Sequence, residues 1–419
     1  MTDHQRPARQ RSRRSVLGLM STASLGIAGT FAIRDVARPG ATLPRDAADV
    51  ATSSPDTPFT GLRAYEEFVA EQAAQDQFSG TILLAHRGRT VLARSYGMAD
   101  KELGIPNRPG TIFNIASLSK IFTGIAACQL AAEGKIDFYA TLGTYLDGFP
   151  AQIAGTVTVY QMFTHTSGMG NYQASPLWQH EAKTWTTPRQ EFADTMAVIR
   201  QSPLLFTPGT AYGYSNSGYY TLGAIVAQVS GQPFGDYVRA RIFGPAGMSH
   251  TNYYTTAQIL ANPGIAHAYG PLQPDGSRFD LTTQPGQIIN TGGGGGAGGG
   301  MSSAPDLLNL ALALANGTLV NPAFSEVLTH GKYPLSPGDL SDQPPGQSIM
   351  SGYGFEERIV GNHRIFGHGG AAPPGGIATD LSIYADLDWT GILLSNYYVN
   401  TRPYLQLEDQ VLTQERTTP

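Results

Sequence analysis

A serine and a lysine three residues apart, Ser117 and Lys120, could form the centre of a hydrolytic site. On a helix, side chains at positions i and i+3 lie on one face, about 5–6 Å apart at Cβ. A hydroxyl becomes a good nucleophile when a neighbouring base removes its proton, and a lysine can be that base only if burial or nearby charge lowers its pKa from about 10.4. The alternative interpretation is a serine that caps a helix beside a solvated lysine. The Ser117–Lys120 pair alone does not distinguish these two interpretations. A catalytic site would need further polar residues from elsewhere in the chain.

Two further segments carry polar residues where an active site could use them. Tyr214 and Asn216 precede an apolar helical run over 219–229. A phenol and a carboxamide can relay a proton and hold a substrate amide, but an aromatic anchor followed by an Asn cap would show the same residues. The second segment is the strand-like run that ends in His368-Gly369-Gly370-Ala371. An edge strand that ends in bare glycine leaves room for a substrate backbone.

Three other features are predicted to be structural. His165 lies in a turn, Thr164-His165-Thr166-Ser167-Gly168, where we expect it to hydrogen-bond its own backbone rather than act in catalysis. The glycine-rich run over 292–300 lacks the Gly-Lys-Ser/Thr ending of a phosphate loop and should instead bring backbone close to a cleft or another strand. Cys128 is the single cysteine, which excludes an internal disulfide, and it is expected to be buried and inert.

The pattern of apolar residues predicts an antiparallel sheet built from both ends of the chain. A helix with an apolar face over 62–73 precedes a hairpin of Gly80–His86 and Thr90–Tyr96. A strongly apolar helix is predicted over Ile115–Ala132. Strand-like runs at 353–359, 364–369, 377–384 and 390–397 are separated by short turns, so they must pair antiparallel, and a helix over 404–412 follows them.

Composition and the N-terminus limit the possible functions. The chain has 419 residues, 41% hydrophobic and 14% charged, with a formal charge of −5, which gives no reason to expect a nucleic-acid partner. Ser12-Arg13-Arg14-Ser15 stands before an uncharged stretch that continues to Ile33, as in a twin-arginine export signal. The alternative is a membrane anchor, although this stretch is of borderline length to span a bilayer.

We therefore expect residues 1–34 to be a twin-arginine signal segment and 35–58 a flexible linker rich in Ala, Pro, Asp, Thr and Ser. The protein would be exported to the periplasm or secreted. Contact with the membrane would occur only through the signal segment if it is not cleaved. Without residues 1–33 the chain has 22 basic and 31 acidic residues, a charge of −9, which does not suit an anionic polymer.

Taken together, the motifs Ser117-x-x-Lys120, Tyr214-x-Asn216 and His368-x-Gly370 resemble those of the serine β-lactamase and penicillin-recognising D,D-peptidase superfamily. The similarity is to the branch of class C β-lactamases, D-alanyl-D-alanine carboxypeptidases, D-aminopeptidases and related esterases. It covers about residues 60–400 and includes connecting segments such as Phe206-Thr207-Pro208-Gly209 and Gly244-Pro245-Ala246-Gly247-Met248.

The resemblance implies an α+β fold with an antiparallel sheet flanked by helices, an inserted mostly helical region, and the active site between them. The serine hydrolase domain would span 59–415. Residues 59–115 and about 290–415 would form the sheet part, and about 116–289 the helical part.

The resemblance also implies roles for individual residues. Ser117 would be the acylated nucleophile, Lys120 its base, and Tyr214 the group that passes a proton to the leaving group and later activates water. Asn216 would hold the substrate's amide or acyl side chain. The backbone N–H groups of Ser117 and Ala371 would form the oxyanion hole. No metal and no organic cofactor would be needed.

The third motif departs from the pattern of most β-lactamases, which begin it with lysine and place a hydroxyl second. Here His368 and Gly369 stand at those positions, followed by Gly370, so a substrate carboxylate loses an expected partner. Arg358 and Arg364 are the two candidates to compensate for this loss. No Glu-x-x-x-Asn deacylation element is evident, so deacylation would fall to Tyr214 or His368.

The sequence therefore predicts an exported serine hydrolase that forms an acyl-enzyme on a D-amino-acid peptide, amide or ester, supplied as a small-molecule or peptide substrate. Peptidase-like and esterase activities are nearly balanced, and β-lactam hydrolysis is a further alternative. A non-catalytic penicillin-binding or regulatory protein is the alternative of another class. An unrelated α/β-hydrolase is disfavoured because the chain lacks Gly-x-Ser-x-Gly.

Overall fold

The computed structural model describes residues 60–284, 286–335, 348–372 and 375–414. The predicted signal segment and the linker up to residue 58 lie outside these ranges, so export stays a prediction. The chain divides by its contacts into Met1–Asp56 and Thr57–Pro419, and all described residues belong to the second unit. Within the described ranges, no helix is both long enough and apolar enough to cross a bilayer.

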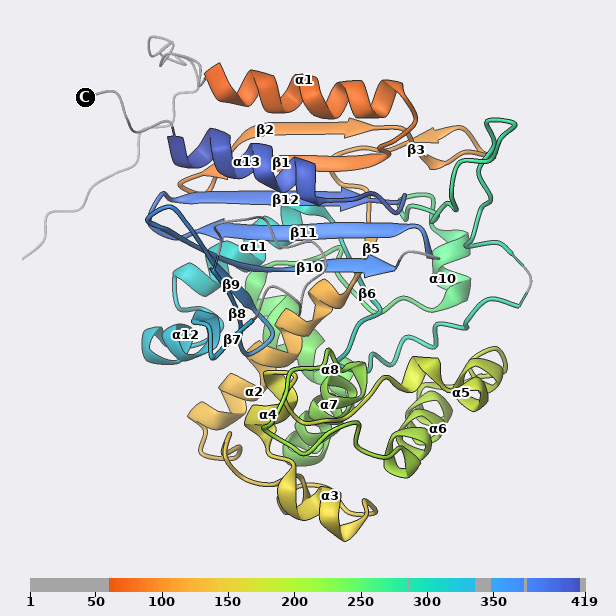
Figure 1. Cartoon of the computed structure of the whole chain (residues 1–419). Helices are drawn as coiled ribbons and strands as arrows, with labels where there is room; N and C mark the ends of the chain where they lie inside the picture. Colours follow the sequence, from red (N-terminus) through yellow and green to blue (C-terminus); the bar gives the residue numbers. More distant parts are fainter. Residues whose placement is uncertain (1–59, 285, 336–347, 373–374, 415–419) are drawn as a thin grey trace, which may run out of the picture. The chain divides into compact units, whose positions relative to one another are not determined.

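An antiparallel sheet forms the upper half of the described unit in Figure 1. Its order, for the described strands, is β2-β1-β12-β11-β10-β9-β8-β7. These strands are β1 (Gly80–His86), β2 (Arg89–Tyr96), β7 (Tyr333–Pro334), β8 (Ser348–Ser351), β9 (Glu356–Val360), β10 (His363–Ala372), β11 (Ile377–Tyr384) and β12 (Trp389–Ser395). Two short pairs lie apart from this sheet: β3 (Met98–Asp100) with β4 (Ile105–Pro106), and β5 (Phe113–Ala116) with β6 (Gly300–Ser302).

The two ends of the chain meet inside the sheet. Strand β1 pairs antiparallel with β12, so that Gly80 lies opposite Ser395 and His86 opposite Trp389. The predicted α+β fold, with an antiparallel sheet built from both ends of the chain, is therefore confirmed.

Helices cover both faces of the sheet and fill the space below it (Figure 1). They are α1 (Thr60–Ala74), α2 (Lys120–Ala132), α3 (Ala151–Thr156), α4 (Val159–Phe163), α5 (Pro176–Glu181), α6 (Pro188–Gln201), α7 (Asn216–Ser230), α8 (Phe234–Val238), α9 (Gly244–Ala246), α10 (Thr256–Ala261), α11 (Ala304–Ala315), α12 (Pro322–Thr329) and α13 (Arg402–Gln414). Short 3-10 turns lie at Ser117–Ser119, Leu142–Thr144 and Tyr172–Ala174, and a π-helical turn at Arg239–Phe243.

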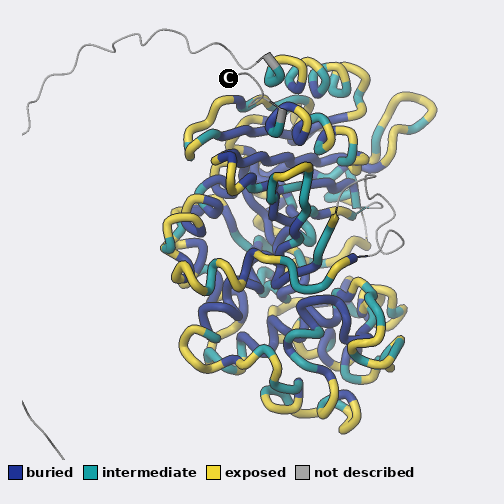
Figure 2. Tube along the Cα trace, turned by 60° about the vertical axis from the view of Figure 1, so that its left-hand side comes forward, coloured by how far each residue is buried: buried dark blue, intermediate teal, exposed yellow. Residues whose placement is uncertain are grey.

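Alternate residues of the central strands face two separate hydrophobic cores. Ile82 and Leu84 of β1 pack with Tyr65 of α1 and Tyr404 of α13, whereas Leu83 packs on the opposite side with residues of α2 and α11. This is the period-two alternation of a sheet that is covered on both faces. Figure 2 shows the same distribution, with buried residues concentrated in the central strands and exposed residues in the outer loops and helices.

Three helices of this unit show how the sequence determines their ends or their burial. Helix α7 begins after Ser215, whose hydroxyl accepts from the Gly218 N–H at 2.8 Å, and it ends at Gly231 with φ 70°. Helix α11 is capped by Ser303, whose hydroxyl accepts from the Asp306 N–H. Helix α2 is buried over most of its length, including Cys128, whose pKa burial raises to about 12.

The structure corrects two details of the predicted elements. The helix expected from Ile115 starts at Lys120 instead, because Phe113–Ala116 pairs as β5 with β6 and Ser117–Ser119 is a 3-10 turn. Strand β10, expected at an edge, is interior over its first half, where β9 pairs with it up to Gly367. Only from His368 onward does β10 lack a described strand partner on that side.

A cluster of acidic residues lies between the sheet and α13. The Tyr384 hydroxyl donates to Asp409 at 2.7 Å and lies 3.0 Å from a carboxyl oxygen of Glu408, and Arg358 forms an ion pair with Asp409. Burial and the charges of Asp380 and Asp409 raise the pKa of Glu408 to about 8, and burial raises that of Asp380 to about 6. At neutral pH the folded cluster therefore holds a proton that an exposed glutamate would release.

This cluster predicts a pH dependence of stability. The folded state keeps the Glu408 proton up to about pH 8, whereas the unfolded chain loses it near the usual glutamate pKa. The free energy of unfolding should therefore fall as the pH rises between these values, by at most about 1.4 kcal/mol per pH unit for one proton. Urea unfolding at a series of pH values measures this slope.

Glu408→Gln removes the titration but keeps a hydrogen-bonding side chain, so its unfolding free energy should depend less steeply on pH. Glu71→Gln, at an exposed position of α1, is the matched control and should keep the slope of the unsubstituted protein. An unchanged slope in Glu408→Gln would show that this carboxyl does not hold the proton.

Candidate active site

Ser117 lies at a sharp turn between strand β5 and the helical segment that leads into α2. The preceding residue, Ala116, has φ 44° and ψ −127°, a conformation that non-glycine residues rarely adopt. The side chain of Asn114 accepts from the Ala116 N–H at 2.9 Å, and Ser119 donates to the Ala116 carbonyl at 2.8 Å. These bonds hold the turn on both sides, so the Ser117 hydroxyl projects from a fixed backbone.

Lys120 is fully buried, and its Nζ contacts three oxygen atoms. These are Ser117 Oγ at 3.0 Å, Asn216 Oδ1 at 2.8 Å and the Ala297 carbonyl at 2.6 Å. No carboxylate of the described residues forms an ion pair with it, and burial lowers its pKa to about 7. A neutral amine has two N–H donors, which the Asn216 and Ala297 carbonyl oxygens accept. Its lone pair is then free to accept the proton of Ser117.

Tyr214 donates from its hydroxyl to Ser117 Oγ at 2.7 Å. One side of its ring packs on His165, with centroids 4.4 Å apart, and the Lys120 Nζ lies 4.8 Å from its centre, while 42% of the residue is exposed. This partial burial raises the pKa of the phenol, so it is neutral near pH 7 and can act as a proton donor.

His165 positions the loop that carries Tyr214. Its Nδ1 accepts from the backbone N–H of Ser215 at 3.0 Å, so the expected bond within its own turn is replaced by one to a residue far along the chain. Burial lowers its pKa well below the usual value, which keeps the ring neutral and able to accept this bond. His165 itself has a φ of 58°, which turns the chain back toward the loop.

The oxygen and the nitrogen of the Asn216 side-chain amide both form hydrogen bonds. Its Oδ1 accepts from Lys120, and its Nδ2 donates to Gln173 Oε1 at 2.7 Å. Neither Gln173 nor the Ala297 carbonyl is predicted by the motifs to be part of the site. The glycine-rich run did predict a close approach of backbone, and Gly296 and Ala297 make it: their carbonyls accept from Thr123 at 2.6 Å and from Lys120. Gln173 has no motif around it that could have singled it out.

The segment from His368 to Ala371 lies beside the Ser117 turn. A Cβ at Gly370 would come within 2.2 Å of the Ile115 carbonyl oxygen, so only glycine allows β10 to pack this closely on β5. At Gly369 the nearest atom would be 3.6 Å away, so the space there would accept a side chain. His368 is buried and contacts the Gly369 carbonyl through Nδ1, and burial lowers its pKa to about 3. It is therefore neutral at physiological pH.

The two arginines considered for carboxylate binding are engaged elsewhere. Arg358 bonds Asp409 and donates to Ser382 Oγ at 2.9 Å, on the face of the sheet that α13 covers. Arg364 forms an ion pair with Glu357 at 3.3 Å and donates to Thr329 Oγ1 at 3.1 Å. The suggestion that either guanidinium compensates for the missing motif lysine has no support in these contacts.

Two groups contact the Ser117 hydroxyl oxygen: the buried Lys120 amine, whose pKa is lowered, and the neutral Tyr214 phenol. Together they can deprotonate a serine and carry a proton toward a leaving group. Among the described residues, no cluster of three or more His, Cys, Asp or Glu side chains is placed to hold a metal ion.

The profile of the family described as "Beta-lactamase" matches residues 65–413, which include this whole site. The chain belongs to the β-lactamase family. It is a serine hydrolase of the β-lactamase and D,D-carboxypeptidase type, as the three motifs suggested.

Individual members of the β-lactamase family show how wide this group is. Penicillin-binding protein 4* of Bacillus subtilis is 29% identical over 330 residues, which are 76% of this chain and 68% of the relative. Esterase EstB of Burkholderia gladioli is 26% identical over 285 residues, or 63% and 71% of the two chains. The crystal structure of a penicillin-binding protein from Bacillus halodurans superposes with a TM-score of 0.67 and 26% identity, covering 81% of this chain and 99% of that one.

The lowered pKa of Lys120 predicts that the reactivity of Ser117 rises with pH through about 7, because the neutral amine is the form that accepts a proton. The rate at which diisopropyl fluorophosphate modifies Ser117, followed by intact-protein mass spectrometry, measures this without a substrate.

Lys120→Arg should lower that rate by about 10²- to 10⁴-fold at pH 7 and remove its dependence near pH 7, since a guanidinium keeps its proton. Lys135→Arg, at an exposed ion pair with Glu133, is the control and should react normally. A fast, pH-dependent reaction of Lys120→Arg would exclude Lys120 as the base.

Proposed function

We propose that this protein hydrolyses an ester or amide bond through an acyl-enzyme on Ser117, and that the leaving group it accepts carries no carboxylate. Its preferred substrates would be esters and amides of D-amino acids, and an uncharged group would occupy the side of the cleft formed by His368–Ala371.

In the proposed mechanism, Ser117 Oγ attacks the substrate carbonyl while its proton moves to Lys120 Nζ. The backbone N–H groups of Ser117 and Ala371 bind the developing oxyanion, where each such donor contributes about 3–4 kcal/mol in known sites. Tyr214 delivers a proton to the leaving oxygen or nitrogen, and the Lys120 ammonium replaces it. In deacylation the neutral Lys120 amine takes the Tyr214 proton while Tyr214 takes a proton from the attacking water, and the proton held by Lys120 passes to Ser117 Oγ as the acid leaves. Asn216 keeps the Lys120 amine oriented and offers its amide to the acyl group.

The charges on strands β9 and β10 support a leaving group without a carboxylate. His368 is neutral, and the arginines of these strands, Arg358 and Arg364, are bound to Asp409 and Glu357. The internal segments outside the described ranges, residue 285, 336–347 and 373–374, contain no lysine or arginine. A substrate carboxylate on this side of the cleft would therefore lose water without gaining a cationic partner from β9, β10 or these segments, which costs more than the loss of one neutral hydrogen bond.

A D,D-peptidase-like activity is the second candidate, because the Bacillus subtilis relative is named a penicillin-binding protein. The esterase from Burkholderia gladioli supports the first candidate in the same way. Both use the same acyl-enzyme chemistry and differ in whether a carboxylate must be recognised. β-Lactam hydrolysis ranks third, since β-lactam antibiotics also carry a carboxylate. A non-catalytic role would leave the hydrogen-bonded arrangement of Ser117, Lys120 and Tyr214 without a purpose.

Three substrates with one acyl group test the proposal: the p-nitrophenyl ester of N-acetyl-D-alanine, N-acetyl-D-alanyl-D-alaninamide and N-acetyl-D-alanyl-D-alanine. We expect hydrolysis of the ester and the amide, with kcat/KM for the D-alaninamide at least about tenfold above that for the D-alanine compound, which differs from it by one carboxylate. Ser117→Ala should hydrolyse none of them and should form no acyl adduct by mass spectrometry.

Gly369→Thr provides the complementary variant, because it returns the hydroxyl of the usual motif to a position with room for a side chain. It should raise kcat/KM for the D-alanine compound relative to the D-alaninamide. Gly370→Ala, which would clash with the Ile115 carbonyl, should lower activity on all three substrates. Preference of the unsubstituted enzyme for the free carboxylate would refute the proposed leaving group, and acylation of Ser117→Ala would refute the mechanism.

A further inference from the structure

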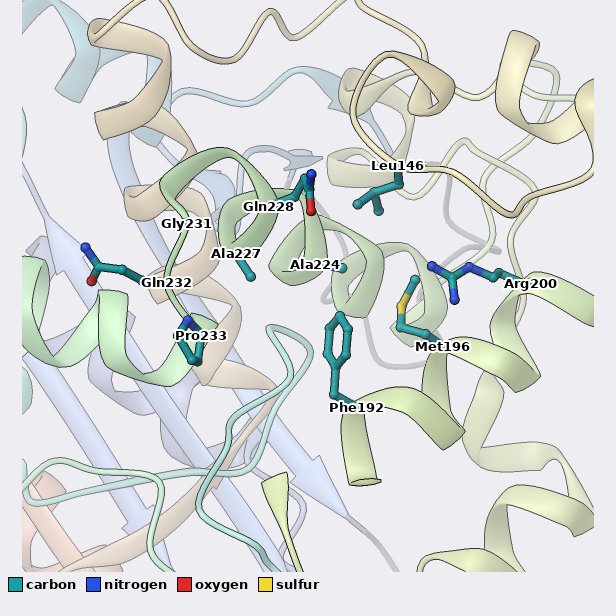
Figure 3. A pocket seen from close by; sticks show the side chains of 10 residues that line it. All are labelled: Leu146, Phe192, Met196, Arg200, Ala224, Ala227, Gln228, Gly231, Gln232 and Pro233. Atoms are coloured by element: carbon teal, nitrogen blue, oxygen red, sulfur yellow. The ribbon is translucent and has the colours of Figure 1, made fainter. Parts of the chain in front are cut away.

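A pocket of about 390 Å³ lies on the helical part of the molecule, between α6, the C-terminal half of α7 and the start of α8 (Figure 3). None of its lining residues belongs to the Ser117 site. Its volume is within the range of small-molecule sites, about 300–1,000 Å³. The walls are largely apolar and include Leu146, Phe192, Met196, Ala224 and Ala227.

Phe192 is the prominent apolar side chain of this pocket. It is 39% exposed although it is a large aromatic residue, whereas Met196, one turn further along α6, is fully buried. In Figure 3 the Phe192 ring points from α6 into the space beside Ala224 and Met196. The pocket therefore offers a hydrophobic surface that a ligand could cover.

Arg200 supplies a positive charge at one end of the pocket. Its guanidinium extends from the end of α6 toward Met196 in Figure 3. The Nε atom is buried, and among the described residues no acceptor bonds it and no carboxylate pairs with the guanidinium. The guanidinium carbon lies 5.7 Å from the centre of the Phe149 ring. By contrast, Arg239, which directly follows α8, forms an ion pair with Asp236.

A partly buried cation without a counter-ion is unfavourable, so this arrangement is better explained by an anion that binds from outside. A guanidinium presents its N–H donors as a planar fork that matches a carboxylate. The single charge suits a monoanion, and the apolar walls suit an aliphatic or aromatic body. We propose that the α6–α7 pocket is a binding site for an amphipathic carboxylate, with its carboxyl group on Arg200 and its apolar part against Phe192 and Met196.

This site is separate from the hydrolytic one and does not depend on the proposed function. Helix α7 contributes Asn216 at its first turn to the Ser117 site and Ala224 and Ala227 near its end to the pocket. Both sites can thus be occupied at once, and binding can be measured on enzyme whose Ser117 has been blocked.

The test uses 4-(4-fluorophenyl)butyrate as the probe, with ¹⁹F NMR titration on protein in which diisopropyl fluorophosphate has modified Ser117. We expect saturable binding that the blocked Ser117 does not prevent. The uncharged 4-(4-fluorophenyl)butanamide should bind at least about tenfold more weakly, because it cannot form the ion pair with Arg200.

Arg200→Gln should weaken binding of the acid by about tenfold or more and bring its affinity close to that of the amide. Arg189→Gln is the matched control, since Arg189 is an exposed arginine at the other end of α6 that does not line the pocket. Phe192→Ala, at a partly exposed position, should weaken binding of the acid and of the amide alike.

Equal affinities for the acid and the amide, or equal affinities of Arg200→Gln and the unsubstituted protein for the acid, would overturn the proposal. So would the absence of saturable binding up to about 10 mM, or loss of binding when Ser117 is blocked. Because none of these measurements uses hydrolysis, their failure would leave the proposed activity at Ser117 untouched.

Discussion

The desolvated amine of Lys120 is the interaction on which the site depends. A buried lysine without a carboxylate loses hydration that its neighbours must replace with hydrogen bonds, and here oxygen atoms from one adjacent and two distant segments do so. Ser117 comes from the turn before α2, Asn216 from the start of α7, and Ala297 from the glycine-rich run. The same burial lowers the pKa of the amine to about 7. Burial thus destabilises the charged form and leaves a neutral amine that can act as a base.

The surrounding fold excludes water from the Lys120 amine and fixes the positions of its hydrogen-bond partners. Glycines allow backbone to approach where a side chain would clash: Gly370 against the Ile115 carbonyl, and Gly300 against Ser119. Behind the sheet, the carboxyl groups near α13 engage Arg358 and hold it on the reverse face. The cleft side of β10 is therefore left with the neutral His368 and small residues, and its chemistry is determined by backbone groups more than by charge.

The sequence predicted features that depend on residues close together in the chain. It did not predict features that depend on backbone from distant segments. Ser117 and Lys120 are close because they are three residues apart, and the strands at both ends follow from alternating apolar residues. Ala297 takes part through its carbonyl, which every residue has, so nothing in its side chain could mark it.

The orientation of Arg358 also could not be predicted. It depends on the register of β9 against β10, in which Arg358 lies opposite Ile365, and a shift by one residue would turn its side chain to the other face. The start of α2 was misplaced for a related reason, since β5 is a strand only because β6 arrives to pair with it.

The pairing of β1 with β12 has a consequence for how the protein is made. Strand β1 leaves the ribosome long before its neighbour in the sheet, β12, has been synthesised. Contacts of such long sequence separation slow folding, because the chain between them must be ordered first. The helices that carry Ser117, Lys120 and Asn216 can form before β10 exists, yet the wall of the cleft that contains His368 and Gly370 cannot. A nascent chain would thus hold its nucleophile in an unfinished cleft, so hydrolytic activity would begin only after β10 and β12 have been synthesised.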